Sequence, residues 1–196
     1  MNANFGELFA LMFSAMLVYN FLLSRFLGMC SFFGVSQKID TAVGMSIAVI
    51  FVMVVSGISA WIINLLLIAW NLEFLQILVF VLIIAALVQF IEIFVKKTNP
   101  VLYNALGIYL PLITTNCAIL GVVLLNLNQN YDLMQTIFNT VGSALGYALA
   151  IILFASIRER LSIDELPPVF EGMPAAFITA FVLSMSFMAF TGMIKA

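Results

Sequence analysis

The spacing of the charged residues limits what this chain can fold into more than any other feature of the sequence. Charges separate six uncharged runs, each at least 17 residues long: 8–24, 41–72, 74–91, 98–131, 133–157 and 172–194. A helix of about 20 mostly apolar residues crosses the roughly 30 Å of hydrocarbon in a bilayer. The runs therefore predict an all-α integral membrane protein with six transmembrane helices.

The overall composition agrees, and it excludes several classes of protein. Charged residues make up 8% of the chain and hydrophobic residues 65%, whereas soluble domains have about 25% and roughly 45–50%. So few charges cannot cover the surface of a water-soluble domain of 196 residues. A soluble enzyme, a nucleic-acid-binding protein and a disordered tail are therefore excluded. We do not expect the first run to be a signal peptide, because Glu7 stands where such a segment carries basic residues.

The distribution of basic residues predicts the orientation of the helices. Six of the seven lysines and arginines lie in or beside the connections between spans 1 and 2, 3 and 4, and 5 and 6. Only Lys195 lies on the opposite side. Cytoplasmic loops of membrane proteins carry the excess of basic residues. We therefore expect both termini outside, in a multi-pass protein of the cytoplasmic (inner) membrane of a prokaryote.

Two of the spans contain helix-breaking residues near the middle. The first continues to about Val35 and contains Leu27-Gly28-Met29-Cys30, and the fourth contains Pro111 followed by Thr114-Thr115-Asn116-Cys117. Proline removes a backbone donor and clashes with the preceding turn, while polar side chains offer the freed backbone other partners. We expect broken or re-entrant helices in spans 1 and 4. Such irregular backbone must face protein or a polar cavity rather than lipid.

A short internal repeat relates the two broken spans. The segments 30–35 and 117–122 share the pattern Cys-x-x-x-Gly-Val at an offset of 87 residues. Three spans in each half would give the two copies opposite orientations, as in an inverted repeat. We therefore expect one transmembrane domain, 1–196, with repeat 1 at about 1–98 and repeat 2 at about 99–196. In this arrangement Cys30 and Cys117 can meet near the membrane midplane.

Cys30 and Cys117 are the candidate metal-binding and cofactor-binding residues. The chain has no histidine, which excludes a bis-histidine haem. A [2Fe–2S] cluster normally takes four thiolates, so if these two cysteines bind one, a second chain must provide the other two. Two alternatives remain open, namely that each cysteine is a small buried hydrophobe or that the two form a disulfide, which a reducing compartment disfavours.

Two further features concern helix packing. Gly142-x-x-x-Gly146 in span 5 permits close helix contact. Five asparagines in the apolar runs are expected to form hydrogen bonds between helices. Asn116 stands out among them because it lies next to Cys117 in the sequence.

Three segments resemble the RnfA/NqrE family of membrane subunits. They are Arg25-Phe26-Leu27-Gly28-Met29-Cys30, Leu106-Gly107-Ile108-Tyr109-Leu110-Pro111-Leu112-Ile113-Thr114-Thr115-Asn116-Cys117-Ala118 and Ile157-Arg158-Glu159-Arg160. The likeness extends over essentially the whole chain, and Thr115 together with the run 120–126 resembles the Rnf branch. The resemblance implies a membrane electron-transfer subunit of an ion-translocating (Na⁺ or H⁺) ferredoxin:NAD⁺ oxidoreductase complex. No independent active site, and hence no catalytic residue, is expected in this chain.

The resemblance also implies a cofactor and protein partners. In this family two cysteines of this subunit and two of a sister six-helix membrane subunit (RnfE-like) are held to bind one [2Fe–2S] cluster, and Cys30 and Cys117 match those positions. Nicotinamide, ferredoxin and flavin sites would belong to other subunits, similar to RnfB, RnfC, RnfD and RnfG. The lipid bilayer is the remaining partner, and no nucleic acid is expected.

Three other functions stay open on the sequence. The first is the NqrE subunit of a Na⁺-translocating NADH:quinone oxidoreductase, the other branch of the same family. The second is a small inverted-repeat permease, which would keep its transport activity without Cys30 and Cys117. The third is a structural scaffold, in which both cysteines could be replaced without loss of electron transfer.

Overall fold

The computed structural model describes residues 5–69, 75–98, 112–113, 116–161, 167 and 172–191. Within these ranges the regular secondary structure is helical, which confirms the prediction of an all-α protein. The elements are α1 (Phe5–Phe13), η1 (Ser14–Val18), α2 (Phe21–Arg25), α3 (Met29–Val35), α4 (Ile39–Ala69), α5 (Gln76–Thr98), α8 (Cys117–Asn128), α9 (Leu133–Leu161) and α10 (Met173–Thr191).

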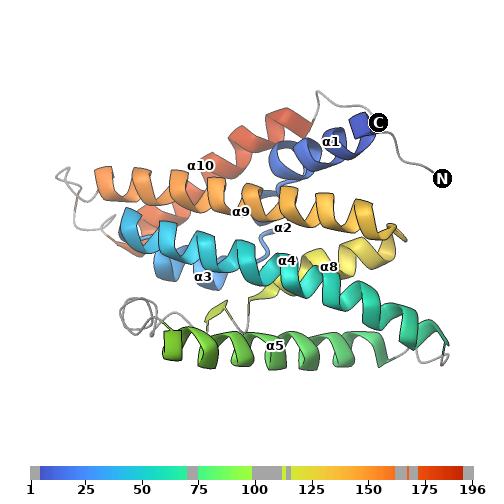
Figure 1. Ribbon diagram of the computed structural model, residues 1–196. Helices are drawn as coiled ribbons and strands as arrows, with labels where there is room; N and C mark the ends of the chain where they lie inside the picture. The colour runs from blue at the N-terminus through green and yellow to red at the C-terminus, as the bar shows by residue number, and fades with distance from the viewer. Residues whose placement is uncertain are drawn as a thin grey trace.

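Helices α4 and α9 form the centre of the molecule (Figure 1). They run side by side and make the most extensive contact between any two described elements. Helices α1 and α10 lie on one side of this pair and α5 on the other, and α8 packs against both α4 and α9. Helix α1 begins and α10 ends at the same end of the molecule (Figure 1).

The two central helices are also the longest apolar ones. By length and composition α4 and α9 can each cross a bilayer, and Phe5–Val18, Gln76–Phe90, Cys117–Asn128 and Met173–Ala189 are shorter apolar helical stretches. Large apolar side chains are exposed along α1, α4, α5 and α10. Such an apolar outer surface suits contact with lipid, and the number of crossings stays a prediction.

Small residues bring α9 close to the beginning of the chain, as the Gly-x-x-x-Gly pattern predicts. A Cβ atom on Gly142 would collide with the Met12 carbonyl, and one on Gly146 would lie 2.8 Å from the Met16 carbonyl oxygen. Only glycine therefore allows α9 to approach the backbone of α1 and η1 this closely. This confirms the predicted close contact at both glycines.

The first apolar segment is interrupted before Cys30, where the sequence predicts a break. Helix α2 ends at Arg25, and Phe26 and Gly28 both have left-handed backbone conformations, with φ of 53° and 88°. Glycine adopts this conformation without steric cost, whereas Phe26 is an unusual residue there. Helix α3 then begins at Met29, one residue before the cysteine.

The same segment has an earlier break that the sequence analysis missed. The π-helix η1 ends at Val18, and Asn20 has an extended backbone and caps α2 by accepting a 3.2 Å hydrogen bond from the Leu22 N–H. Asparagine is a favoured N-cap residue, so Asn20 was the available signal. Its position in an apolar run had indicated only a hydrogen bond between helices.

The second predicted break lies partly outside the described residues. Pro111, Thr114 and Thr115 are not among them. Asn116 has an extended backbone, with φ of −72° and ψ of 109°, and α8 begins at the next residue, Cys117. Each cysteine thus follows directly on the start of a new helix.

Candidate metal centre

Cys30 and Cys117 come together in the structure although 87 residues separate them in the sequence. Cys30 lies in the first turn of α3, and Cys117 is the first residue of α8. The two thiol groups are in hydrogen-bond contact. Both cysteines are exposed at the surface of the chain, so neither is the small buried hydrophobe that remained an alternative on the sequence.

The turns that carry the two cysteines are packed directly against each other. A Cβ atom on Gly28 would lie 3.1 Å from both the Ala118 Cβ and the Asn116 Oδ1. Gly28 is buried, as are Asn116 and Ala118. Any larger residue at position 28 would therefore push the turn before Cys30 away from the turn before Cys117.

The repeated motif makes reciprocal contacts between the two halves of the chain. Gly34 of the first copy lies against Leu112, at 3.7 Å from a constructed Cβ to the leucine Cδ1. Gly121 of the second copy lies against Leu27, at 2.7 Å by the same measure. Each motif glycine thus receives a leucine that shortly precedes the cysteine of the other copy. This exchange fits the pseudo-symmetry predicted from the Cys-x-x-x-Gly-Val pattern.

A chain of buried hydrogen bonds supports the turn before Cys30. The Tyr147 hydroxyl donates to Ser31 Oγ at 2.9 Å, and Ser31 Oγ donates to the Gly28 carbonyl at 2.9 Å. Tyr147 and Ser31 are both 0% exposed. The sequence analysis missed these two residues, because Tyr147 lies on α9 and no local pattern relates it to α3.

Asn116 occupies the corresponding place before Cys117. Its side-chain oxygen accepts a 3.1 Å hydrogen bond from the Ala118 N–H and so caps α8. The residue is 3% exposed, and its amide nitrogen has no hydrogen-bond partner within the described part of the chain. The sequence analysis singled out Asn116 for its position, and the structure adds its role as a cap.

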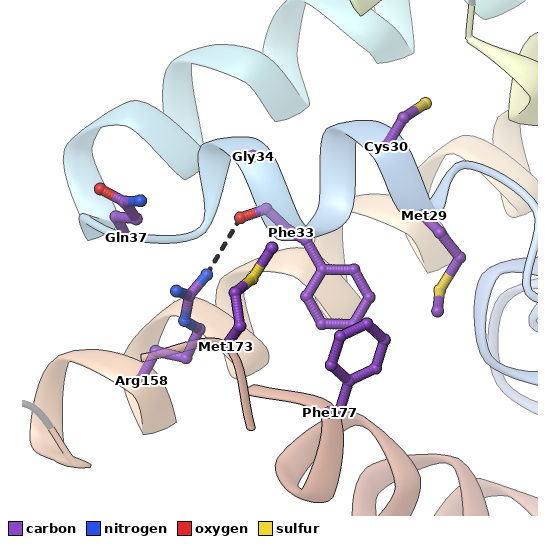
Figure 2. A pocket seen from close by; sticks show the side chains of 8 residues that line it. All are labelled: Met29, Cys30, Phe33, Gly34, Gln37, Arg158, Met173 and Phe177. Atoms are coloured by element: carbon purple, nitrogen blue, oxygen red, sulfur yellow. Dashed lines mark hydrogen bonds between the residues drawn. The ribbon is translucent and has the colours of Figure 1, made fainter. Parts of the chain in front are cut away.

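A cavity of about 500 Å³ lies beside α3 (Figure 2). Its wall includes the Phe33 and Phe177 rings, whose centroids are 4.7 Å apart. Although Cys30 also lines this cavity, Figure 2 shows its sulfur pointing away from the two rings. The aromatic wall and the thiol thus belong to different sides of α3.

Arg158 fixes the far end of α3. Its Nη1 donates to the Phe33 carbonyl at 3.0 Å and to Ser36 Oγ at 2.9 Å; Figure 2 draws the first of these bonds. Helix α3 is therefore tied to α9 at both ends, by Tyr147 near Cys30 and by Arg158 near its last turn. Arg158 belongs to the Ile157–Arg160 segment of the family resemblance, which here has a structural role.

The donor set is incomplete for a metal held by one chain. No group of three or more His, Cys, Asp or Glu residues that could hold a metal ion occurs among the described residues. The whole chain contains only two cysteines. A site of four thiolates at Cys30 and Cys117 therefore requires a second polypeptide.

Comparison with known proteins decides the family. Residues 8–194 match the family described as Rnf-Nqr subunit, membrane protein. The chain belongs to the Rnf-Nqr family. This confirms the resemblance found in the sequence, and it identifies the chain as a membrane protein, in agreement with its composition.

Individual Rnf-Nqr relatives are similar over nearly their full length. The chain is 52% identical over 184 residues to the RnfA-type subunit of the Na⁺-translocating ferredoxin:NAD⁺ oxidoreductase complex of Acetobacterium woodii, covering 93% of this chain and 96% of the relative. It is 50% identical over 190 residues to the corresponding subunit of the ion-translocating oxidoreductase complex of Pasteurella multocida, covering 96% and 99%. That of Syntrophotalea carbinolica is 48% identical over 189 residues, covering 96% and 98%. All three have the same designation within their complexes, which agrees with the Rnf-type resemblance.

Proposed function

We propose that this chain is an electron-transfer subunit of an ion-translocating ferredoxin:NAD⁺ oxidoreductase complex of the Rnf type. In this proposal Cys30 and Cys117 supply two of the four thiolates of a [2Fe–2S] cluster, and a sister membrane subunit supplies the others. The observation that carries the proposal is the contact between the two exposed thiols at the starts of α3 and α8. The names of the similar subunits supply the reaction class.

The residues present fit half of such a cluster. Thiolate sulfur is the usual ligand of [2Fe–2S] clusters, which take four of them. Both thiols reach the surface on adjacent turns, while the residues after them, Ser31 and Ala118, are buried. Two sulfur donors at a protein surface leave one side of the site for a partner. A partner with the same cysteine pair would complete the set across the interface.

The described residues have two tasks around this site. When bound, the cluster supplies reversible one-electron transfer. Cys30 and Cys117 hold it, and Gly28 allows their turns to lie close enough to do so. The apolar contacts of Gly34 with Leu112 and of Gly121 with Leu27 keep water from the backbone behind the thiols. A rigid, dry first layer limits reorganisation when the charge at the site changes.

The membrane arrangement is part of the same proposal. Six transmembrane helices in two inverted repeats, about 1–98 and 99–196, would place the cysteine pair near the midplane, with both termini outside in a prokaryotic cytoplasmic membrane. Three observations support it: the reciprocal glycine–leucine contacts, the helix start at each cysteine, and the beginning of α1 and end of α10 at one end of the molecule. A relay at the midplane divides a hydrocarbon layer of roughly 30 Å into two shorter steps.

The test is the iron and acid-labile sulfide content of this chain co-expressed with its sister subunit. We expect about two irons and two sulfides per pair, as a [2Fe–2S] cluster contains. Cys30→Ala and Cys117→Ala should each abolish this content. Ser186→Ala, a similarly small change at an exposed residue of α10, should preserve it. A well-folded wild-type pair without iron would contradict the proposal.

A further inference from the structure

The buried polar groups behind the two cysteines form one connected set. Tyr147 on α9 reaches α3 by donating to Ser31 Oγ at 2.9 Å, and Ser31 in turn donates to the Gly28 carbonyl at 2.9 Å. The Asn116 side chain also reaches the Tyr147 hydroxyl. Since Asn116 directly precedes Cys117 and Ser31 directly follows Cys30, the tyrosine lies between the two thiol-bearing turns.

These turns need an external support. Gly28 has a φ of 88°, and glycine has the largest choice of backbone conformations of any residue. Its carbonyl accepts from Ser31 Oγ and also from the Phe32 N–H at 3.1 Å. Irregular backbone at membrane depth is stable only when such groups are paired within the protein. The hydroxyl chain therefore determines which conformation the turn before Cys30 adopts.

The support also differs between the two copies of the repeat. Ser31 corresponds to Ala118 in the second copy, which has no hydroxyl. On that side the Asn116 side chain takes the place of the serine, as a cap on the Ala118 N–H with a buried amide nitrogen available for Tyr147. One tyrosine thus serves both cysteines through two different neighbours.

We propose that Tyr147 is a positioning residue that, through Ser31 and Asn116, fixes the separation of the Cys30 and Cys117 thiols. The use of this separation for cluster binding rests on the function proposed above. Tyr147 is fully buried, so Tyr147→Phe removes the hydroxyl and keeps the ring volume. Ser31→Ala breaks the same chain at its next link and introduces the residue that the second copy already has.

The first experiment measures thiol separation without any cluster. The full-length chain, expressed without its sister subunit, is treated in membranes with a mild azo oxidant, which takes up the two electrons and two protons that the thiols release when the disulfide forms. We expect Tyr147→Phe to lower the rate of Cys30–Cys117 disulfide formation roughly fivefold, the population change that follows from losing one net hydrogen bond. Ser31→Ala should lower it similarly.

The matched control is Tyr131→Phe. Tyr131 lies in the connection between α8 and α9, outside the network, so its loss of the same oxygen atom should leave the rate unchanged. The double variant Ser31→Ala/Tyr147→Phe should be no slower than either single variant, because residues of one network do not act additively. An unchanged or higher rate in both single variants would overturn the proposal.

The second experiment uses the iron-loaded pair. Tyr147→Phe should keep most of the iron but broaden the EPR signal of the reduced cluster, since the two ligands then occupy several positions, whereas Tyr131→Phe should reproduce the wild-type signal. A wild-type signal in Tyr147→Phe, together with a wild-type disulfide rate, rejects the positioning role and leaves the cluster proposal intact. A wild-type pair without iron, with a slowed disulfide rate in Tyr147→Phe, rejects the cluster and retains the positioning role.

Discussion

The side-chain nitrogen of Asn20 donates a 2.8 Å hydrogen bond to the carbonyl oxygen of Gly146, which joins the first break in the chain to the middle of α9. The oxygen of the same side chain caps α2. Asn20 is 1% exposed, so one buried residue serves a helix start and a contact between helices. The helices that present Cys30 and Tyr147 therefore have a fixed relation before any partner binds.

The two functions of Asn20 can be separated by substitution. Asn20→Ser retains a capping oxygen and loses the donor to Gly146, while Asn20→Ala loses both. We expect the serine variant to lower the free energy of unfolding by about 1 kcal/mol and the alanine variant by about 1 kcal/mol more. Unfolding in SDS-containing mixed micelles measures both. Equal losses in the two variants would show that the cap contributes nothing.

Close contact between α9 and α1 predicts a sharp size limit at Gly142 and Gly146. Gly142→Ala places a methyl group against the Met12 carbonyl, and Gly146→Ala places one 2.8 Å from the Met16 carbonyl oxygen. Forcing backbones apart in this way costs about 1–3 kcal/mol of unfolding free energy. The control is Gly6→Ala, since nothing lies within 4 Å of a Cβ there. Melting temperatures in detergent should fall for the first two variants only.

A hydrogen-bonded group of polar side chains joins α8 to α9 at the other end from the cysteines. Asn139 donates to Asn126 Oδ1 at 2.6 Å, and Asn126 donates to Thr140 Oγ1 at 2.9 Å. Asn126→Leu should destabilise the chain by about 1 kcal/mol. Thr140→Val added to Asn126→Leu should cost less than the sum of the single changes, because the two residues share one bond. Additive losses in SDS unfolding would argue against a shared network.

Arg158 predicts a difference between two basic side chains. Its Nη1 holds both the Phe33 carbonyl and Ser36 Oγ at the end of α3. Lysine is a point charge without the planar guanidinium, so Arg158→Lys should loosen α3 and reduce iron retention of the assembled pair severalfold. Arg160→Lys, at an exposed position near the end of α9, serves as control. Equal iron retention in the two variants would remove Arg158 from this role.

The sequence was sufficient for the features that depend on local chemistry and repeat symmetry. The glycine at position 28 predicts the break before Cys30, and the matching motifs predict that Cys30 and Cys117 approach each other. The left-handed Phe26 could not be predicted, because such a conformation is rare for a bulky residue and is imposed by its surroundings. The Tyr147–Ser31 bond likewise depends on how α9 packs against α3, which no spacing along the chain reveals.

The central claim is that Cys30 and Cys117 provide half of a shared cluster, and ⁵⁷Fe Mössbauer spectroscopy of the co-expressed pair tests it most directly. Oxidised wild type should show two equivalent high-spin ferric sites in tetrahedral sulfur coordination that couple to a diamagnetic ground state. Reduction by one electron should convert one site to ferrous iron. Cys30→Ala or Cys117→Ala should remove the spectrum, whereas Ser186→Ala should retain it. An unaltered iron spectrum in the cysteine variants, or no bound iron in a folded wild-type pair, would contradict the account.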